Sequence, residues 1–323
     1  MGFIYSQLFV TPHYPVKMYN GQTVIVTGSN TGLGKEATRH FVRLGAARVI
    51  MAVRNLTAGE AAKTDIVNST HCDSRIIDVW PLDLSSNDSV KNFAKRASTE
   101  LERVDVLTEN AGVVSGKFTL DDEVKQERSI AINVVRTFLL ALLMLPKLKE
   151  TATKFGVKTR LTIVSSEVHA WTKLEQRNEP AMFDALARSE KVDMNELYPI
   201  SKLLEVLAVR EIAPKLTNSG VILNMVNPGL CHSELSRDAP FTLEVMKFFL
   251  ARKTEVGSRT LVAAAEVGDE SHGKYMTDGC VDDGALSPFV KSEEGKETGA
   301  KVWRELSQIL ETIEPGVTAN LEK

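Results

Sequence analysis

Two side chains in this sequence, Tyr198 and Lys202, have the types and the spacing needed for acid–base catalysis. They are four residues apart at the start of a helical pattern, so they share one face of the helix. A free tyrosine has a pKa near ~10, but a nearby ammonium group favours the phenolate and lowers that pKa. Such a tyrosine can protonate a carbonyl oxygen that receives a hydride, or deprotonate an alcohol in the reverse direction.

A pair of serines supplies a third functional group. Ser165 and Ser166 close the apolar run 161–164, which precedes the tyrosine in the chain. A hydroxyl at the end of that strand can hold the substrate oxygen beside the phenol. A Tyr-x-x-x-Lys pair by itself is common on exposed helices, so its position after this strand is what favours an active site.

A glycine-rich segment near the N-terminus predicts a phosphate-binding loop. It follows the apolar run 24–26, precedes a helical pattern, and has the sequence Thr27-Gly28-Ser29-Asn30-Thr31-Gly32-Leu33-Gly34. The glycines allow a tight turn and let backbone amides approach a pyrophosphate at the positive end of the helix. Glycines also simply mark turns, but a position between a strand and a helix favours a dinucleotide site.

The end of the second strand indicates which dinucleotide binds. A carboxylate there would bind the ribose 2′-hydroxyl of NAD and repel a 2′-phosphate. The run 49–52 is instead followed by Val53 and Arg54, whose planar guanidinium suits a phosphate. We therefore expect NADP(H), with Ser29 adding a hydroxyl contact to the same phosphate. The alternative is an ordinary surface arginine after a strand.

A parallel sheet is predicted to position these groups. Short β-branched runs alternate with longer amphipathic stretches, which predicts an α/β fold: a single-domain Rossmann fold with a doubly wound parallel sheet and helices on both faces. The predicted strands are 24–26, 49–52, 76–79, 104–107, 161–164 and 221–226. The predicted helices are 34–44, 58–68, 89–101, 124–145 and 197–216.

Three regions are expected along the chain. Residues 1–20 form an N-terminal arm, residues 21–290 the NADP-binding catalytic domain, and residues 291–323 a charged loop leading to a C-terminal helix. The apolar residues expected on that last helix are Trp303, Leu306, Ile309 and Leu310.

These motifs and their spacing resemble the short-chain dehydrogenase/reductase family over most of the chain. Asp83-Leu84, after the third strand, matches that family's adenine contact. Asn110-Ala111-Gly112, after the fourth, matches its Asn-Asn-Ala-Gly motif. Glu109 stands where the first asparagine is usual, so we expect a loop-stabilising hydrogen bond to be missing while the fold is retained.

The resemblance also implies roles for residues near the tyrosine. Ser166, rather than Ser165, aligns with the catalytic serine. Asn133 aligns with the asparagine that holds a water between the lysine and bulk solvent; its other interpretation is a helix-capping or kink-forming residue. The resemblance further implies that Lys202 bonds the ribose hydroxyls, and that hydride is transferred at C4 of the nicotinamide.

The segment after the sixth strand completes the resemblance. Asn227-Pro228-Gly229 matches the turn beside the nicotinamide, and Ser233 the position that often binds its carboxamide. Cys231 and His232 between them are adjacent loop residues rather than a catalytic dyad. His169, after the fifth strand, is expected to be a packing or substrate-wall residue rather than a base.

Pro199, directly after the tyrosine, needs an explanation because proline breaks helix interiors. It is accommodated if Tyr198 lies in the first helical turn, with Asp193 or Asn195 as the N-cap.

Two variable segments are predicted to shape the substrate site. Tyr198 follows Ser166 by 32 residues, a longer gap than is usual in the family, so an insertion at 167–195 lies beside the active site. A second segment, 230–253, follows the sixth strand. Their apolar side chains are Trp171, Met182, Phe183, Leu186, Leu235, Phe241, Leu243, Met246, Phe248, Phe249 and Leu250. Core packing is the alternative, but loops carry specificity, and we expect an apolar polyketide, terpenoid, retinoid-like or steroid-like substrate.

Within the family the chain is similar to the retinol-dehydrogenase-like branch and to fungal members with a comparable N-terminal arm. In this sequence the arm carries Ser6-Gln7-Leu8-Phe9-Val10-Thr11-Pro12. Such fungal enzymes frequently modify secondary metabolites. We expect no N-terminal membrane anchor, and the sequence leaves peripheral membrane association open.

Composition excludes several other classes of protein. The net charge is −3 and no Lys/Arg block is present, so no nucleic-acid partner is expected. Three widely spaced cysteines and six scattered histidines indicate no metal site and a reducing, cytoplasmic location. The most apolar run, 138–145, is shorter than the ~20 residues that a membrane-spanning helix requires.

The leading hypothesis is therefore an NADP-dependent oxidoreductase, expected to act as a ketoreductase in secondary metabolism. One alternative is a redox-neutral cyclase, isomerase or dehydratase, and another is an NADP-sensing binding protein, because fold does not determine function. The presence of Tyr198 and Lys202 counts against the binding protein. The resemblance leaves a homodimer or homotetramer open, formed through helices 124–145 and 197–216.

Overall fold

The computed structural model describes residues 3–232 and 250–322, and this part of the chain is built on one sheet with the strand order β3-β2-β1-β4-β5-β6-β7-β8. The strands from β3 to β7 are parallel, and β8 is antiparallel to β7. Their bounds are β1 Thr23–Thr27, β2 Arg48–Val53, β3 Ile77–Pro81, β4 Val106–Glu109, β5 Thr159–Val164, β6 Val221–Asn227, β7 Tyr275–Thr277 and β8 Cys280–Val281. The strand order reverses between β1 and β4, where open α/β sheets bind their ligands.

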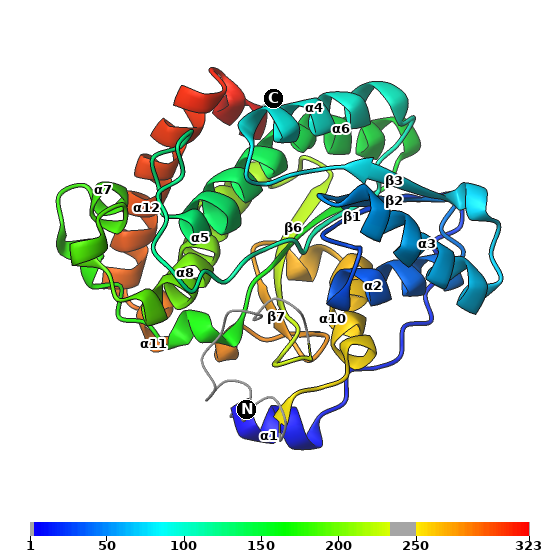
Figure 1. Ribbon diagram of the computed structural model, residues 1–323, viewed down its shortest axis with the longest axis horizontal. Coiled ribbons are helices and arrows are strands. Elements are labelled where there is room, and N and C mark those ends of the chain that lie inside the picture. The colour runs from blue at the N-terminus through cyan, green and yellow to red at the C-terminus, as the bar shows by residue number, and fades with distance from the viewer. Residues whose placement is uncertain (1–2, 233–249, 323) are drawn as a thin grey trace.

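Helices cover both faces of this sheet and give three layers (Figure 1). One face carries α2 Gly32–Arg43, α3 Leu56–Thr70 and α10 Thr254–Glu266. The other carries α4 Asn87–Glu100, α6 Thr137–Phe155 and α8 Met194–Ile212, with α12 Glu293–Ile313 packed on α8. The short helices are α1 Phe3–Phe9, α5 Arg128–Ile130, α7 Met182–Leu186 and α11 Pro288–Lys291. The predicted doubly wound α/β Rossmann fold is confirmed.

Side-chain alternation along the strands creates two hydrophobic cores. Ile25 of β1 belongs to the core that contains Phe93 of α4. Val24 and Val26, which point the opposite way, belong to the core that contains Phe41 of α2. Because β1 is buried on both faces, its sequence is a continuous apolar run rather than an alternating one.

The C-terminal region and the edge of the sheet differ from their prediction. The charged residues after 291 form no loop, because α12 begins at Glu293 and Ser292 caps it by accepting a hydrogen bond from the Gly295 amide. Glu293 and Glu294 then lie in the first turn, where acidic side chains are favoured by the helix dipole.

Strands β7 and β8 were not predicted, since runs of three and two residues are too short to show a pattern.

The helical stretch Arg128–Phe155 is long and apolar enough to cross a membrane by composition, but 89% of its most apolar window is buried inside the molecule. It packs against α4 and against the short helical turn Val317–Leu321, which makes it a core helix. A π-helical turn at Ala131–Arg136 interrupts it. Such turns occur frequently at functional sites.

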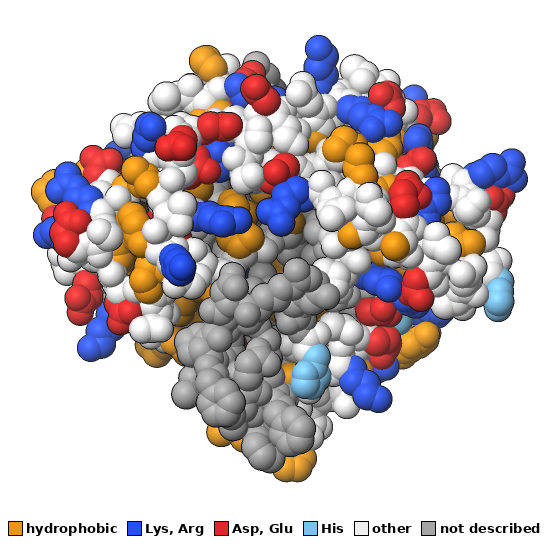
Figure 2. Space-filling model, viewed as in Figure 1, with side chains coloured by type: hydrophobic (Ala, Val, Ile, Leu, Met, Phe, Trp, Pro, Cys, Tyr) orange, Lys and Arg blue, Asp and Glu red, His pale blue; other side chains and the backbone are white. Residues whose placement is uncertain are grey.

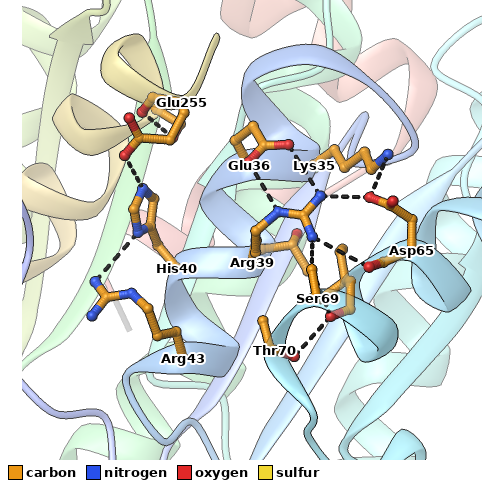
Figure 3. A network of polar contacts seen from close by, with 12 residues as sticks. Lys35, Glu36, Arg39, His40, Arg43, Asp65, Ser69, Thr70 and Glu255 are labelled. Carbon is orange, nitrogen blue, oxygen red and sulfur yellow. Dashed lines mark hydrogen bonds and ion pairs between the residues drawn. The ribbon is translucent and has the colours of Figure 1, made fainter.

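A polar network holds α2, the helix that follows the glycine loop, against its neighbours (Figure 3). Lys35 and Arg39 both pair with Asp65 of α3, at 2.9 and 2.6 Å. His40, elsewhere on α2, contacts Glu255 of α10 at 3.1 Å. The two pairs with Asp65, whose side chain is exposed, contribute about 0–1 kcal/mol each, so their main effect is to orient the helix.

The N-terminal arm is fastened beside the turn that follows β6. The side-chain amide of Gln7 donates to the carbonyl oxygens of Leu230 and Leu250, at 2.9 and 3.0 Å. Next to these contacts Arg252 pairs with Asp278 at 2.6 Å. The arm therefore joins parts of the chain that are far apart in sequence.

Charge is mixed on the face of the molecule shown in Figure 2. There Lys and Arg side chains lie among Asp and Glu side chains, without a broad area of one sign. This distribution is consistent with the net charge of −3. The described Lys and Arg side chains on this face form no positive strip of the kind that follows a nucleic-acid backbone.

Candidate active site

The glycine loop lies at the carboxyl end of β1 and leads directly into α2. Gly28 and Gly32 have φ angles of +64° and +56°, in the left-handed region that favours glycine. A Cβ on Gly34 would lie 2.6 Å from the side-chain nitrogen of Asn110, so the start of α2 packs too closely for another residue. Thr31 at the N-cap makes no side-chain capping bond. The first amides of α2 are therefore left for an anion.

Asn110 ties the ends of β1 and β4 together. Its side-chain amide donates to the Thr27 carbonyl oxygen at 2.9 Å, and the backbone amides of Asn110 and Ala111 donate to Thr27 Oγ1 at 3.0 and 2.9 Å. A Cβ on Gly112 would lie 3.9 Å from Lys202 Nζ. The Asn-Ala-Gly segment thus connects the glycine loop with the candidate catalytic lysine.

Arg54 and Ser29, the two residues expected to bind a 2′-phosphate, have different settings. Arg54 follows β2 as an exposed residue, and no ion pair connects it to the described part of the chain. The Ser29 hydroxyl is instead fully buried and donates to the Val26 carbonyl oxygen at 2.9 Å. The expected hydroxyl contact of Ser29 is therefore wrong for this conformation, because the tight turn directs the side chain inward.

Asp83 and Leu84 follow β3, where the resemblance implies an adenine contact. One carboxylate oxygen of Asp83 accepts hydrogen bonds from the Ser85 amide at 2.8 Å and the Ser85 hydroxyl at 2.7 Å. The second oxygen stays available to a ligand. Leu84 is buried and belongs to the larger core, so any contact it makes with a cofactor is through its backbone or the edge of its side chain.

Tyr198 and Lys202 lie together in α8 and face the end of β5. Lys202 Nζ donates to the Val164 carbonyl oxygen at 2.9 Å and is 5.7 Å from the centre of the Tyr198 ring. Burial raises the pKa of Tyr198, and the charge of Lys202 and the Ser166 hydroxyl act in the opposite direction. The prediction included the effect of the lysine but not the larger effect of burial, which depends on residues distant in the chain.

The two serines after β5 have different environments. Ser165 is buried, and its hydroxyl donates to the Lys202 carbonyl oxygen at 3.3 Å. Ser166 is half-buried, caps the short helical turn Glu167–Ala170 and contributes to the pKa of Tyr198. The geometry thus favours Ser166 over Ser165 as the hydroxyl that reaches a substrate oxygen.

Both ring nitrogens of His169 are used in packing. Nδ1 contacts the Ser166 carbonyl oxygen at 2.8 Å, and Nε2 accepts a hydrogen bond from the Ser287 amide at 3.2 Å. Burial lowers the pKa of His169, which keeps the ring neutral. This environment agrees with a packing role rather than that of a base.

Asn133 lies in the π-helical turn, directly behind the Asn-Ala-Gly segment. Its Oδ1 accepts from the Val113 amide at 2.8 Å, and its Nδ2 donates to the Val113 carbonyl oxygen and to Ser201 Oγ, at 2.9 and 3.0 Å. The side chain is fully buried, so water held here would use the backbone. The distorted helix also agrees with the alternative interpretation of Asn133 as a kink-forming residue.

The turn after β6 has the expected form. Gly229 has a φ of +77°, and its amide donates to Asn227 Oδ1 at 3.0 Å beside Pro228. Burial raises the pKa of Cys231 to about 12, which makes its thiolate inaccessible and agrees with the rejection of a Cys–His dyad. Ser233 lies outside the described residues.

The helix that carries the tyrosine begins earlier than expected. Asp193 is its N-cap and accepts a hydrogen bond from the Asn195 amide at 2.9 Å. Tyr198 is therefore the fifth helical residue rather than a member of the first turn, and Pro199 lies inside the helix. Because proline has no N–H, the Asn195 carbonyl receives no helical hydrogen bond from it.

A buried glutamate, Glu205, lies beside Lys202 and was not among the predicted site residues. Glu205 Oε1 accepts from Lys202 Nζ at 2.8 Å. The one available signal was its position three residues after the lysine, on the same helical face. Glu109, at the end of β4, is also buried, and its carboxylate oxygens have no hydrogen-bond partner among the described residues.

The insertion at 167–195 is only partly available to a substrate. Met182, Phe183 and Leu186 are buried in the larger core, and the Phe183 amide donates to Glu305 of α12 at 2.9 Å. Their expected place on the substrate wall is therefore wrong, because α12 covers them. Trp171 is 52% exposed. The apolar residues expected between 235 and 249 lie outside the described residues.

Known proteins share both this sequence and this architecture. A family model described as short chain dehydrogenase matches residues 22–167. The short chain dehydrogenase/reductase dmxR8 of Cryptosporiopsis sp. (strain 8999) is 52% identical, over 99% of this chain and 100% of its own length. The short-chain dehydrogenase anuD of Penicillium roqueforti is 40% identical, over 98% and 84%. Among solved structures, the NADPH bound carbonyl reductase from chicken fatty liver has a TM-score of 0.61 at 18% identity, over 83% of this chain and 99% of that chain.

Proposed function

The chain belongs to the short-chain dehydrogenase/reductase family, and we propose that it is an NADP-dependent enzyme that interconverts a carbonyl and an alcohol on an apolar small molecule. One observation carries the proposal. Tyr198 and Lys202 lie beside Gly112 and the end of β5, at the same edge of the sheet as the glycine loop. Fold by itself does not determine function, so the proposal rests on this arrangement of side chains.

Bound NADPH would supply the hydride, while the side chains of this protein handle the proton. Tyr198 protonates the substrate oxygen as it gains negative charge in reduction, and accepts the proton from the alcohol in oxidation. Ser166 donates a hydrogen bond to the same oxygen. The Lys202 ammonium stabilises the phenolate that Tyr198 leaves behind and bonds the ribose hydroxyls.

The residues present fit a dinucleotide with a 2′-phosphate. The close packing at Gly34 and the open first turn of α2 suit a pyrophosphate. Arg54 is exposed after β2, and no carboxylate ends that strand. These features support NADP(H) over NAD(H), as does the likeness in fold to an NADPH-bound carbonyl reductase.

The proposed substrate is an apolar polyketide, terpenoid, steroid-like or retinoid-like compound, and the proposed role is that of a ketoreductase in secondary metabolism. Fungal short-chain dehydrogenases that match nearly the whole chain support this setting. A cytoplasmic location is proposed because Cys72, Cys231 and Cys280 are free, as in a reducing compartment.

Label transfer tests the proposal directly. NADPH with deuterium as the transferable C4 hydrogen is incubated with the protein and an extract of its source organism, and Tyr198→Phe serves as the control. We expect a deuterated product that the control does not form. Conversion that depends on Tyr198 but transfers no label would instead favour a redox-neutral cyclase, isomerase or dehydratase. Absence of any Tyr198-dependent product would contradict the proposal.

A further inference from the structure

The side chain of Gln7, in the N-terminal arm, makes three hydrogen bonds to the backbone of the segment that follows β6. Its Oε1 accepts from the Leu230 amide at 3.2 Å, and its Nε2 donates to the carbonyl oxygens of Leu230 and Leu250 at 2.9 and 3.0 Å. A primary amide has one carbonyl oxygen and two N–H donors, so Gln7 uses each of these groups here. The residue is 8% exposed, which strengthens bonds of this kind relative to those in water.

Gln7 also packs directly against the turn after β6, residues 227–230. Gly229 in this turn has a φ of +77°, and its amide donates to Asn227 Oδ1 at 3.0 Å. A Cβ on Gly229 would overlap Gln7 Oε1 and would lie 2.9 Å from Nη1 of Arg252. The arm and the turn are therefore in direct contact, and the position of the turn depends on the position of Gln7.

The turn begins beside the end of β5, where the proposed reaction takes place. The Ser165 amide donates to the Val226 carbonyl oxygen at 2.9 Å, so Ser166 and Asn227 are the next residues along two paired strands. A nicotinamide that transfers hydride has to approach the reacting carbon within about 3–3.5 Å. In the proposed function Ser166 and Tyr198 hold the oxygen bonded to that carbon. The turn therefore borders the space that the nicotinamide has to enter.

The backbone on both sides of Gln7 is held by Arg252. Its Nη2 donates to the carbonyl oxygens of Ser6 and Val10 at 2.7 and 3.0 Å, and it pairs with Asp278 at 2.6 Å. The Arg252 amide donates in turn to the Leu230 carbonyl oxygen at 2.8 Å. Charge-assisted bonds of this kind are short and strong, so Gln7 has little freedom to move relative to the turn.

We propose that Gln7 is a positioning residue of the active site, which holds the turn 227–230 in the place that the nicotinamide ring requires. This inference rests on the proposed function, because that function assigns the ring to the space between Ser166 and the turn. A support that is already fixed loses less conformational entropy when the cofactor binds. A displacement of about 1 Å can also slow a reaction ~100-fold, so the effect extends from binding to hydride transfer.

Calorimetric titration with two ligands tests the proposal on the full chain. NADPH is compared with 2′-phospho-ADP-ribose, which lacks the nicotinamide. Gln7→Met keeps the length of the side chain and removes its three hydrogen bonds. We expect NADPH to bind about tenfold more weakly, on the scale of one or two hydrogen bonds, and 2′-phospho-ADP-ribose to bind as in the wild type. Gln308→Met, at an exposed glutamine of α12, is the matched control and should change neither affinity.

The second ligand separates a positioning role from a general loss of structure. An unchanged affinity for 2′-phospho-ADP-ribose shows that the variant folds and keeps the glycine loop. Equal losses for both ligands in a variant with the wild-type circular dichroism spectrum, or no loss for either, would overturn the proposal. Equal affinities of the wild type for the two ligands would overturn it too, because the ring would then contribute nothing to binding.

A second variant decides the question where Gln7→Met does not fold. Gln7→Glu keeps an acceptor for the Leu230 amide but replaces the two donors to the carbonyl oxygens of Leu230 and Leu250. The same loss, confined to NADPH, is expected from it. A loss shared by both ligands in this folded variant, or none, would contradict the role of Gln7.

The titrations require no turnover, so this inference and the proposed function fail separately. A loss confined to NADPH, in a protein that transfers no label to any product, would retain Gln7 as a support of the ring and reject the redox reaction. Label transfer by a protein in which Gln7→Met changes both affinities alike, or neither, would retain the reaction and reject the role of Gln7.

Discussion

Tyr198 is the residue on which the proposed chemistry depends, and its surroundings act on its proton in opposite directions. Burial stabilises the neutral phenol, while Lys202 and Ser166 stabilise the phenolate. Binding of a cofactor with a positively charged ring would add to the effect of the lysine. The pKa of Tyr198, and hence its ability to donate a proton, thus depends on burial and on the neighbouring charges together.

Replacement of Tyr198 by phenylalanine removes the proton and keeps the packing of the ring. We expect kcat to fall by about 100-fold or more, with the Kd for NADPH unchanged, since general acid catalysis contributes on that scale. Turnover and cofactor fluorescence titrations measure the two quantities. Tyr14→Phe, at an exposed tyrosine, is the control. Retained turnover would mean that another group supplies the proton.

Arg54 is expected to determine the choice of cofactor. Arg54→Ala should weaken NADPH binding about 10- to 100-fold, because a charge-assisted hydrogen bond contributes about 1.5–3 kcal/mol. NADH binding should change little. Arg75→Ala, at an exposed arginine in the short helical turn Ser74–Ile76, should affect neither. Equal losses for both cofactors would show that Arg54 does not contact the 2′-phosphate.

Among the elements, the N-terminal arm is held by an enclosed ion pair, because Arg252 donates to the Ser6 carbonyl oxygen and the Ser6 hydroxyl donates to Asp278, each at 2.7 Å. Arg252 and Asp278 have side chains that are 5% and 13% exposed. Asp278→Ala leaves the arginine without its carboxylate, and loss of one partner of a buried pair costs about 3–5 kcal/mol. We expect a clear fall in stability to urea and in Tm. Asp269→Ala, which breaks an exposed pair with Lys158, should cost far less. Similar losses of stability in both variants would show that the buried pair that holds the arm contributes no more than an exposed pair.

Helix α8 shows how one element serves two purposes. Its inner face carries Tyr198, Lys202 and Glu205, and its outer face packs against α12. The Asp193 cap starts the helix early enough to place the tyrosine within regular helix in spite of Pro199. Helical geometry therefore sets the spacing between Tyr198 and Lys202. The packing of α8 against α12 determines that both side chains face the end of β5.

At the scale of the whole molecule, the C-terminal region covers the two helices that the resemblance suggested as a pairing surface. Val302, Leu306 and Leu310 of α12 enter the same core as α8, and the turn Val317–Leu321 packs on α6. We therefore predict a monomer rather than the homodimer or homotetramer that the resemblance left open. Light scattering after size-exclusion chromatography at micromolar concentration measures the mass. A dimer or tetramer there would show that another surface forms the interface.

Much of the fold could be predicted because its signals are local. Apolar runs such as 24–26 and 221–226 mark strands buried on both faces, and amphipathic stretches mark the helices between them. The glycine loop and the Tyr198–Lys202 pair are likewise short motifs whose spacing is preserved in any fold that keeps a strand and a helix there. The sequence by itself therefore determined the fold class, the family resemblance and the candidate catalytic residues.

Other features were decided only by the tertiary structure, because they depend on contacts between distant parts of the chain. The Ser29 hydroxyl turns inward, and α12 buries Phe183, which removes both from the surfaces expected for them. Lys202 and Glu205 of α8 are separated in sequence from the end of β5 by the insertion, yet Lys202 donates to the Val164 carbonyl oxygen and both side chains are enclosed there. A local pattern specifies which residues share one strand or helix; the enclosure and charge around Lys202 arise only when several elements pack together.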